Sequence, residues 1–186
     1  MRHYHLLNLG SLAGLAVLFG CDGSSVTSPS AESSPTSVAS ASRPRPWKES
    51  YQASGTITRD VTRCPDPQLL VTLTGGGTAT HIGRYTIINS HCVDPTTGDL
   101  TAGTFVKTAA NGDQIFGSYV GSSIVLQEPA PVGIFSVNGT ITFTGGTGRF
   151  AGATGTTNMS GTLDADFSQV PVAAQSSLTM VGTISY

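Results

Sequence analysis

Residues 137–161 read Val-Asn-Gly-Thr-Ile-Thr-Phe-Thr-Gly-Gly-Thr-Gly-Arg-Phe-Ala-Gly-Ala-Thr-Gly-Thr-Thr-Asn-Met-Ser-Gly, and this stretch decides the fold. Ile141 and Phe143 alternate with threonines, a pattern typical of a half-buried strand. The glycine-dense segment 145–148 then interrupts the strand, and apolar residues resume at Phe150 and Ala153. Because glycine tolerates positive φ angles and tight bends, the stretch predicts a strand–corner–strand unit from a closed or nearly closed antiparallel sheet.

Strand patterns continue on both sides of this unit, from about residue 50 to the end of the sequence. The predicted strands are 51–59, 68–74, 78–92, 100–109, 114–126, 135–144, 149–160 with its continuation 162–167, and 174–186. No window has a helical period. The fold class is therefore all-β, with about eight antiparallel strands in an up-and-down barrel and a sandwich as the second choice.

Glycine and proline mark the connections between these strands. Gly75-Gly76-Gly77 predicts a turn or a bulge, and residues 95–99 predict a hairpin. Asn111-Gly112 predicts a tight type I′ hairpin, in which both central residues have positive φ. Residues 127–133 contain two prolines and predict a longer loop.

The N-terminus has the three parts of an export signal, which we place at residues 1–20. Arg2 begins it, an apolar core follows, and Leu18-Phe19-Gly20-Cys21 resembles the bacterial lipobox. That resemblance implies lipidation at Cys21 and a location in the bacterial cell envelope, outside the cytoplasm and anchored to a membrane. An ordinary cleaved signal and a short membrane anchor are the alternatives, although the apolar run is shorter than the roughly 20 residues that span a bilayer.

A Ser/Pro-rich segment follows at 21–47 and is predicted to be a disordered tether, because it has almost no large apolar side chain. Trp47 marks the start of order, and 48–186 form the barrel domain. The formal net charge of −2 and the lack of any basic run argue against a nucleic-acid partner.

Three cysteines are present. If Cys21 carries lipid, Cys64 and Cys92 remain, and an exported protein with two such cysteines most simply forms one disulfide. The alternative is a metal site at His91, Cys92 and Asp94, but this spacing matches no strong zinc pattern. We therefore expect no metal and no cofactor.

Residues 144–155, Thr-Gly-Gly-Thr-Gly-Arg-Phe-Ala-Gly-Ala-Thr-Gly, resemble the corner motif of the allene oxide cyclase and dirigent barrels. The resemblance implies an eight-stranded, calycin-like antiparallel barrel over most of residues 51–186. The residues that carry this structural corner are Gly145, Gly146, Gly148, Phe150, Gly152 and Gly155. No catalytic residue of the plant enzymes lies within the motif, so none is transferred to this protein.

Several side chains are candidates for the barrel lining, although packing of a filled core explains them equally well. They are His81, Phe105, Phe116, Tyr119, Phe135, Phe143 and Phe167. Glu128 is either an acid at the barrel mouth or a solvated loop residue. Asp164 and Asp166 form an outward polar stripe or a weak calcium contact.

The sequence predicts a lipid-anchored, non-enzymatic barrel that binds a small hydrophobic molecule or an envelope component, or that is purely structural. The alternative is an enzyme of the cyclase or dirigent kind, which steers a reactive hydrophobic intermediate by shape. Such an enzyme needs an apolar cavity of at least a few hundred Å³ with one or two buried polar groups.

Overall fold

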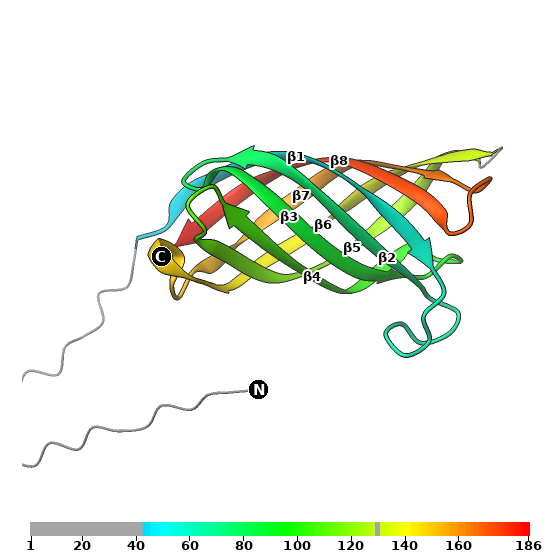
Figure 1. The fold of residues 1–186 in the computed structure, drawn as a ribbon, viewed down its shortest axis with the longest axis horizontal. Coiled ribbons are helices and arrows are strands. Elements are labelled where there is room, and N and C mark those ends of the chain that lie inside the picture. Colours follow the sequence, from blue (N-terminus) through cyan, green and yellow to red (C-terminus); the bar gives the residue numbers. More distant parts are fainter. Residues whose placement is uncertain (1–42, 129–130) are drawn as a thin grey trace, which may run out of the picture. The chain divides into compact units, whose positions relative to one another are not determined.

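The computed structural model describes residues 43–128 and 131–186, and its eight strands form one closed antiparallel barrel (Figure 1). The strands are β1 (Arg45–Thr58), β2 (Leu69–Ala79), β3 (Gly83–Val93), β4 (Asp99–Ala109), β5 (Gln114–Gln127), β6 (Val132–Gly146), β7 (Thr154–Asp166) and β8 (Val172–Ser185). Each strand pairs with the next, and β8 pairs with β1. The all-β, eight-stranded barrel is thereby confirmed. The signal peptide, Cys21 and the tether up to residue 42 lie outside the described residues.

Side chains alternate between the barrel interior and solvent. In β1, Trp47, Glu49 and Tyr51 are buried while the residues between them are exposed. β8 repeats the pattern from Ala174 to Met180. This period of two is what a pleated strand imposes when one face is buried. The apolar inner faces of all eight strands therefore share one core.

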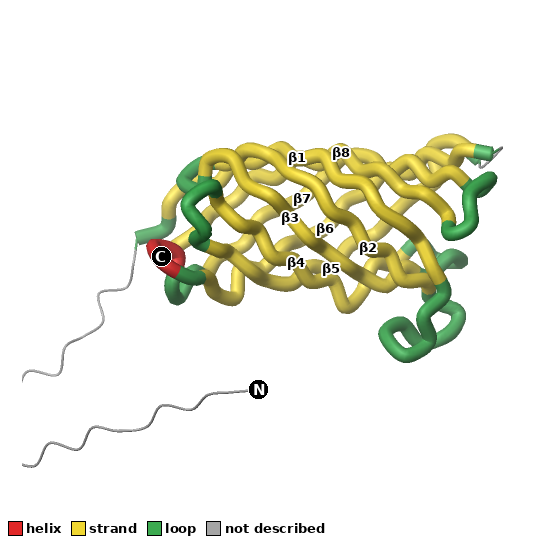
Figure 2. Tube along the Cα trace, in the orientation of Figure 1, coloured by secondary structure: helices red, strands yellow, loops and turns green. Residues whose placement is uncertain are grey.

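The two ends of the barrel differ. At one end lie the start of β1, the C-terminus of the protein and the short 3₁₀ turn η1 (Gly148–Phe150), which is the red segment in Figure 2. Buried Trp47 and Phe150 fill this end, with Trp47 packed edge-on against Phe143 at 5.1 Å between ring centroids. At the opposite end are the loops 59–68, 94–98 and 167–171. The barrel is thus closed by aromatic side chains at the η1 end.

Several strand boundaries differ from the sequence prediction. Gly75-Gly76-Gly77 was expected to be a turn or bulge, but it lies within β2 and pairs in continuous register with β1 and β3. A Cβ on Gly75 would lie 2.1 Å from the Gln52 carbonyl oxygen, so these glycines allow neighbouring strands to approach closely. The true turn is at 80–82, and the predicted single strand 78–92 is wrong because it crosses that turn.

The glycine-rich corner connects β6 to β7 through residues 147–153. Gly145 and Gly146 end β6, whereas Gly148 and Gly152 adopt positive φ values of 56° and 73° in the connection. The expected strand 149–160 is wrong at its start, because η1 occupies 148–150 and β7 begins only at Thr154. Phe150 turns inward from this connection and becomes fully buried.

The tight type I′ turn at Asn111-Gly112 is also not found. The connection has four residues, 110–113, and only Gly112 has a positive φ, 88°. The Gly112 amide donates to the Ala109 carbonyl at 2.9 Å, so a wider turn closes this hairpin. At the N-terminal side, β1 begins at Arg45 and includes the last residues of the segment expected to be a tether.

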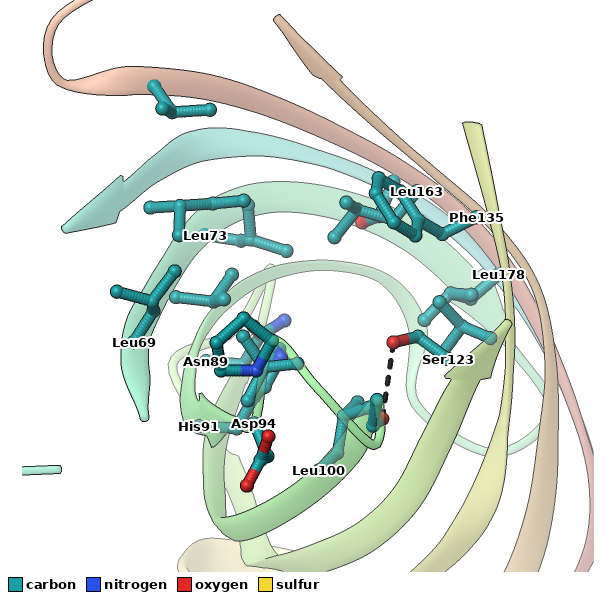
Figure 3. Close-up of a pocket in the computed structure, with 18 of the residues that line it drawn as sticks. Leu69, Leu73, Asn89, His91, Asp94, Leu100, Ser123, Phe135, Leu163 and Leu178 are labelled. Atoms are coloured by element: carbon teal, nitrogen blue, oxygen red, sulfur yellow. Dashed lines mark hydrogen bonds between the residues drawn. The ribbon is translucent and has the colours of Figure 1, made fainter. Parts of the chain in front are cut away.

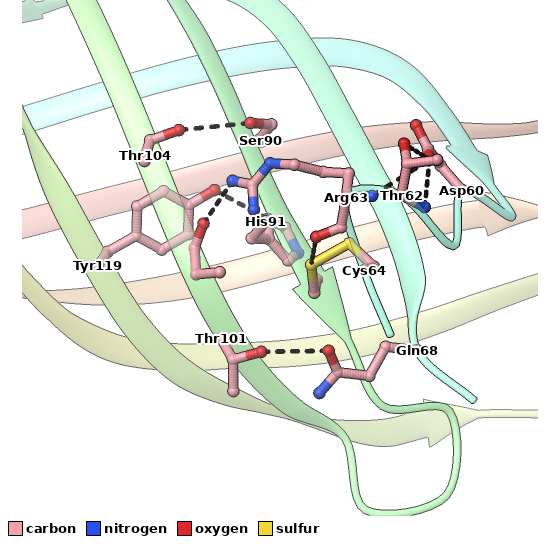
Figure 4. The surroundings of a disulfide bond; sticks show 12 residues. Asp60, Thr62, Arg63, Cys64, Gln68, Ser90, His91, Thr101, Thr104 and Tyr119 are labelled. Atoms are coloured by element: carbon pink, nitrogen blue, oxygen red, sulfur yellow. Dashed lines mark hydrogen bonds between the residues drawn. A yellow bond between two sulfur atoms is a disulfide. The ribbon is translucent and has the colours of Figure 1, made fainter. Parts of the chain in front are cut away.

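The Cys64–Cys92 disulfide is confirmed, with 5.5 Å between the two Cα atoms (Figure 4). It joins the β1–β2 loop to β3. The Arg63 guanidinium, next in the sequence, donates to the Ala102 carbonyl at 2.8 Å, and this ties the same loop to β4. Since Cys92 is in the disulfide, the alternative metal site that used its thiolate is wrong. Residues 43–128 and 131–186 contain no cluster of three metal-ligating side chains and no helix long and apolar enough to cross a membrane.

Candidate functional site

The barrel encloses a cavity of about 1120 Å³ that reaches the end opposite η1. Its outer part touches Arg59, Asp94, Glu128 and Gln169 from the loops at that end, and its inner part reaches Lys107. Because aromatic side chains fill the η1 end, the cavity is blind. Figure 3 shows Leu73, Leu100 and Leu178 among the side chains that surround it.

The wall is mostly apolar and receives side chains from every strand. The apolar wall residues on the strands include Ile57, Leu69, Val71, Leu73, Ile87, Leu100, Phe105, Phe135, Val137, Ile141, Met159, Leu163, Val172, Leu178 and Met180. A large apolar cavity with few polar groups is typical of sites for small molecules. In a barrel of this strand number, side chains alone can fill the interior, or the interior can hold one small ligand. The number of strands therefore does not by itself explain an open cavity of this size.

A group of five polar side chains also lines the cavity, and we call it the polar network: Tyr51, Asn89, His91, Tyr119 and Ser176. The Tyr119 hydroxyl lies 2.8 Å from His91 Nδ1 and donates to Asn89 Oδ1 at 3.5 Å. Asn89 Nδ2 in turn donates to the Tyr51 hydroxyl at 3.5 Å. Four of the five members are therefore linked across the cavity wall.

Ser176 completes the polar network but lacks a hydrogen bond. Its hydroxyl lies near that of Tyr51 and opposes the rise that burial causes in the pKa of that phenol, yet it forms no hydrogen bond of ordinary geometry. The residue is only 6% exposed, and its alternation with Ala174 and Leu178 directs it into the barrel. Buried hydroxyls normally have partners, so this one is a point of unused hydrogen-bonding capacity facing the cavity.

Burial controls the protonation of the polar network. It lowers the pKa of His91 from 6.5 to about 4, so the imidazole is neutral at pH 7. Burial, reinforced by the nearby Glu49 charge, raises the pKa of Tyr51, and burial likewise raises the pKa of Tyr119. The polar network therefore has no formal charge near neutral pH.

Beneath the polar network lies a buried ion pair between Lys107 on β4 and Glu49 on β1. The Lys107 ammonium donates to Glu49 Oε2 at 2.5 Å, and both side chains are fully buried. Trp47 Nε1 donates to the same oxygen at 2.8 Å, and the Tyr85 hydroxyl donates to Oε1. Burial lowers the pKa of Lys107, while the Glu49 carboxylate opposes that effect. Three donors thus compensate one buried carboxylate.

Aromatic rings surround the Lys107 ammonium as well. It lies 4.9 Å from the ring centroid of Phe105, 5.5 Å from those of Trp47 and Tyr85, and 5.8 Å from that of Phe143. Cation–π attraction at these distances favours the charged form. The pair and its rings form the innermost part of the site, which we call the floor.

The mouth of the cavity combines apolar and acidic side chains. Ile124 and Val125 on β5 and Phe167 in the β7–β8 loop line it and are largely exposed. Ser123 donates to the Gly98 carbonyl at 3.1 Å and links β5 to the β3–β4 loop (Figure 3). Glu128 is exposed and also lines the cavity, so its position agrees with both of its sequence interpretations.

Most of the predicted lining residues point into the barrel, but not all of them line the cavity. Phe105, Tyr119 and Phe135 line the cavity, and Phe167 lies at its mouth with 45% of its surface exposed. Phe143 points into the barrel but packs against Trp47 and Phe105 in the floor, outside the cavity wall.

The lining prediction is wrong for His81 and Phe116. His81 is exposed in the β2–β3 turn at φ 71°, with Nε2 3.0 Å from the Pro46 carbonyl oxygen, because the strand it was assigned to breaks there. Phe116 is half-buried and covers Gly145, where an added Cβ would lie 2.6 Å from its ring. A register shift follows Phe116, and its neighbour Ile115 takes the inward position.

Sequence reasoning missed the floor pair and most of the polar network. Glu49 follows Trp47 at a spacing of two, and Lys107 follows Phe105 in the same way, so strand alternation alone could have placed both inside. His91 was considered only as a metal ligand.

Asp164 is exposed on β7, and Asp166 accepts hydrogen bonds from Ser168 in the next turn.

These features define a blind-ended β-barrel with a large apolar cavity, a neutral polar network in its wall and an ion pair at its floor. The structure establishes the barrel class and identifies no family. Comparisons with protein-family models, with curated proteins and with solved structures found no match.

Proposed function

We propose that this protein is a non-enzymatic binding protein whose barrel holds a small hydrophobic molecule. The observation that carries the proposal is the apolar cavity of about 1120 Å³ in a barrel that its own side chains could have filled. Leaving that volume open forgoes packing contacts, which destabilises a fold unless a ligand supplies them. The exposed apolar side chains at the mouth give such a ligand an apolar entrance.

Titration of the full-length protein with the neutral apolar dye N-phenyl-1-naphthylamine tests this proposal. The dye should bind saturably and its fluorescence should rise. Val137→Trp and Leu163→Trp each place a large ring in the cavity, and we expect either to weaken dye binding about tenfold or more. Val120→Trp, on the exposed face of β5, is the matched control and should bind like wild type. A wild-type protein that leaves the dye free would refute the proposal.

An enzymatic role is the second candidate, and the His91–Tyr119 pair in the cavity wall favours it. A neutral imidazole 2.8 Å from a phenol can accept or relay a proton during a reaction of a bound molecule. Kinship with the allene oxide cyclase and dirigent barrels, proposed from the 144–155 motif, would fit this role. Mass spectrometry of a ligand recovered from the barrel distinguishes the two candidates: an unchanged mass and isomer composition supports binding, and a His91-dependent product supports catalysis.

We further propose that Cys21 carries a lipid that anchors the barrel to a membrane of the bacterial envelope. The support is the likeness of 18–21 to a lipobox and the Ser/Pro-rich stretch that separates it from β1. Radiolabelled palmitate should enter the wild-type protein and be lost in Cys21→Ser, whereas Ser25→Ala should keep the label. Labelled Cys21→Ser protein would overturn the anchor.

A further inference from the structure

We infer that the molecule held in this cavity is apolar except for an uncharged hydroxyl or carbonyl group that hydrogen-bonds to Ser176, with His91 as a second open hydrogen-bonding position in the polar network. The inference rests on the proposed function and specifies the chemical class of its ligand. It is carried by the polar atoms that the cavity wall leaves unused and by the balance of charge inside the barrel.

Ser176 is the first of these unused groups. Its hydroxyl is buried, lies in the cavity wall and has no hydrogen-bond partner among the residues that the structure describes. An alanine would fit the same inward position of β8 without the unfavourable desolvation of an unpaired hydroxyl. A hydroxyl can both donate and accept, so a ligand alcohol or a ligand carbonyl oxygen would satisfy it.

His91 supplies the second group. Its Nδ1 is engaged with the Tyr119 hydroxyl, and its Nε2 has no hydrogen bond with any residue of the described ranges 43–128 and 131–186. A neutral imidazole has one donor nitrogen and one acceptor nitrogen. Whichever tautomer Tyr119 selects, Nε2 therefore stays available, either as a donor to a ligand oxygen or as an acceptor from a ligand hydroxyl.

Charge balance excludes an ionic ligand head group. The ammonium of Lys107 and the carboxylate of Glu49 compensate each other at the floor, and His91 is neutral. The ionisable groups Arg59, Asp94 and Glu128 lie at the mouth. Arg63 is near enough to influence Tyr119, but its guanidinium is exposed and already donates to the Ala102 carbonyl. A carboxylate or phosphate drawn to the depth of Ser176 would be a buried charge without a counter-ion, which is strongly unfavourable.

Displacement of N-phenyl-1-naphthylamine from the full-length protein by four molecules of equal carbon number tests the inference. The competitors are hexadecane, 1-hexadecanol, 2-hexadecanone and, at pH 8, hexadecanoate. One net hydrogen bond corresponds to a two- to tenfold gain in affinity at about 0.5–1.5 kcal/mol. We therefore expect the alcohol and the ketone to displace the dye at two- to tenfold lower concentration than hexadecane. Hexadecanoate should displace it less well than either the alcohol or the ketone.

Two variants locate the effect. Ser176→Ala should remove most of the advantage of the alcohol and the ketone while hexadecane still competes, and Ser177→Ala, exposed next to it on β8, should behave like wild type. His91→Phe should also reduce the advantage of the alcohol and the ketone over hexadecane, because it removes the Nε2 nitrogen. Equal affinities for hexadecane and hexadecanol, tightest binding of hexadecanoate, or an unchanged preference in Ser176→Ala would each overturn the inference. In all three cases the dye would still bind, whereas failure of the proposed function would show as no dye binding at all.

Discussion

Replacing Glu49 with glutamine removes the anion that faces a fully buried ammonium group. In the native barrel the Lys107 ammonium lies 2.5 Å from Glu49 Oε2, and neither side chain reaches solvent. The variant keeps the size of residue 49, and its amide oxygen can still accept from Trp47 Nε1 or the Tyr85 hydroxyl. What changes is therefore the charge. The perturbation isolates the electrostatic compensation of Lys107.

The expected loss of stability follows from this geometry. Removing one partner of a buried ion pair typically costs about 3–5 kcal/mol, because the other charge stays buried without compensation. The aromatic rings around Lys107 recover part of that energy by cation–π attraction, so we expect the lower half of the range. In a domain with a total stability of about 5–15 kcal/mol, a loss of this size leaves the variant folded but markedly weaker.

The loss should depend on pH in a defined direction. Burial lowers the pKa of Lys107 and Glu49 opposes it, so the pKa must fall further in the variant. A lysine whose folded pKa lies below its unfolded value of about 10.4 makes the folded state more stable as pH rises toward that value. The stability gap between wild type and Glu49→Gln should therefore narrow between about pH 7 and pH 9.5.

Urea unfolding followed by tryptophan fluorescence measures these quantities, because Trp47 lies in the floor. The double variant Glu49→Gln/Lys107→Met should recover most of the lost stability, since no uncompensated charge remains. Lys48→Met, exposed next to Glu49, is the control and should change stability by less than about 0.5 kcal/mol. A loss below about 1 kcal/mol for Glu49→Gln, or a double variant less stable than Glu49→Gln, would refute the reasoning.

Three further outcomes follow from the described residues. Cys64→Ser/Cys92→Ser opens a loop across a sequence separation of 28, so urea unfolding should show about 3–4 kcal/mol lower stability, and an unchanged midpoint would contradict the loop-entropy argument. Because burial lowers the pKa of His91 from 6.5 to about 4, stability should fall as pH drops through that window, by up to roughly 3 kcal/mol, and His91→Gln should flatten that slope. Gly152→Ala forces a side chain into φ 73° where no neighbouring atom lies within 4 Å, so backbone strain alone should cost about 1–2 kcal/mol in thermal unfolding, and no loss would show that the turn relaxes.

The barrel class could be predicted because burial on one face imposes a period of two on every strand. Ile141 and Phe143 in β6, or Leu178 and Met180 in β8, show that period directly. Closure of the sheet followed from the number of such segments and their short connections. In these strands the local pattern agrees with the fold of the whole domain, so composition and spacing were sufficient to predict the barrel class.

The connections could not be predicted to the same degree, because glycine has two uses in a barrel. Gly112 and Gly152 adopt positive φ angles in turns, whereas Gly75 lets neighbouring strands approach each other closely. The sequence does not distinguish these uses. The β2–β3 turn places His81 at φ 71°, which is uncommon for a non-glycine residue, and Gly83 at φ 75° was taken as part of a strand.

The interior polar groups escaped prediction for a different reason: they come from strands that are far apart in the sequence. Glu49 and Lys107 are 58 residues apart, and β1 and β4 are not neighbours in the sheet. Their contact exists only because the barrel closes and brings opposite walls together. Ser176 and His91 are likewise far apart in the sequence, and both are recognisable as cavity-lining groups only once the barrel is closed.

The ion pair and the polar network have different consequences, although both place polar atoms inside one barrel. The floor pair is complete, since Glu49 receives three donors and Lys107 has both an anion and aromatic rings. It therefore affects stability and offers little to a ligand. The polar network is incomplete at Ser176 and at His91 Nε2, so it affects stability unfavourably and has capacity for a ligand. Variants of the floor should consequently change unfolding more than ligand preference, and variants of the polar network should change ligand preference more than unfolding.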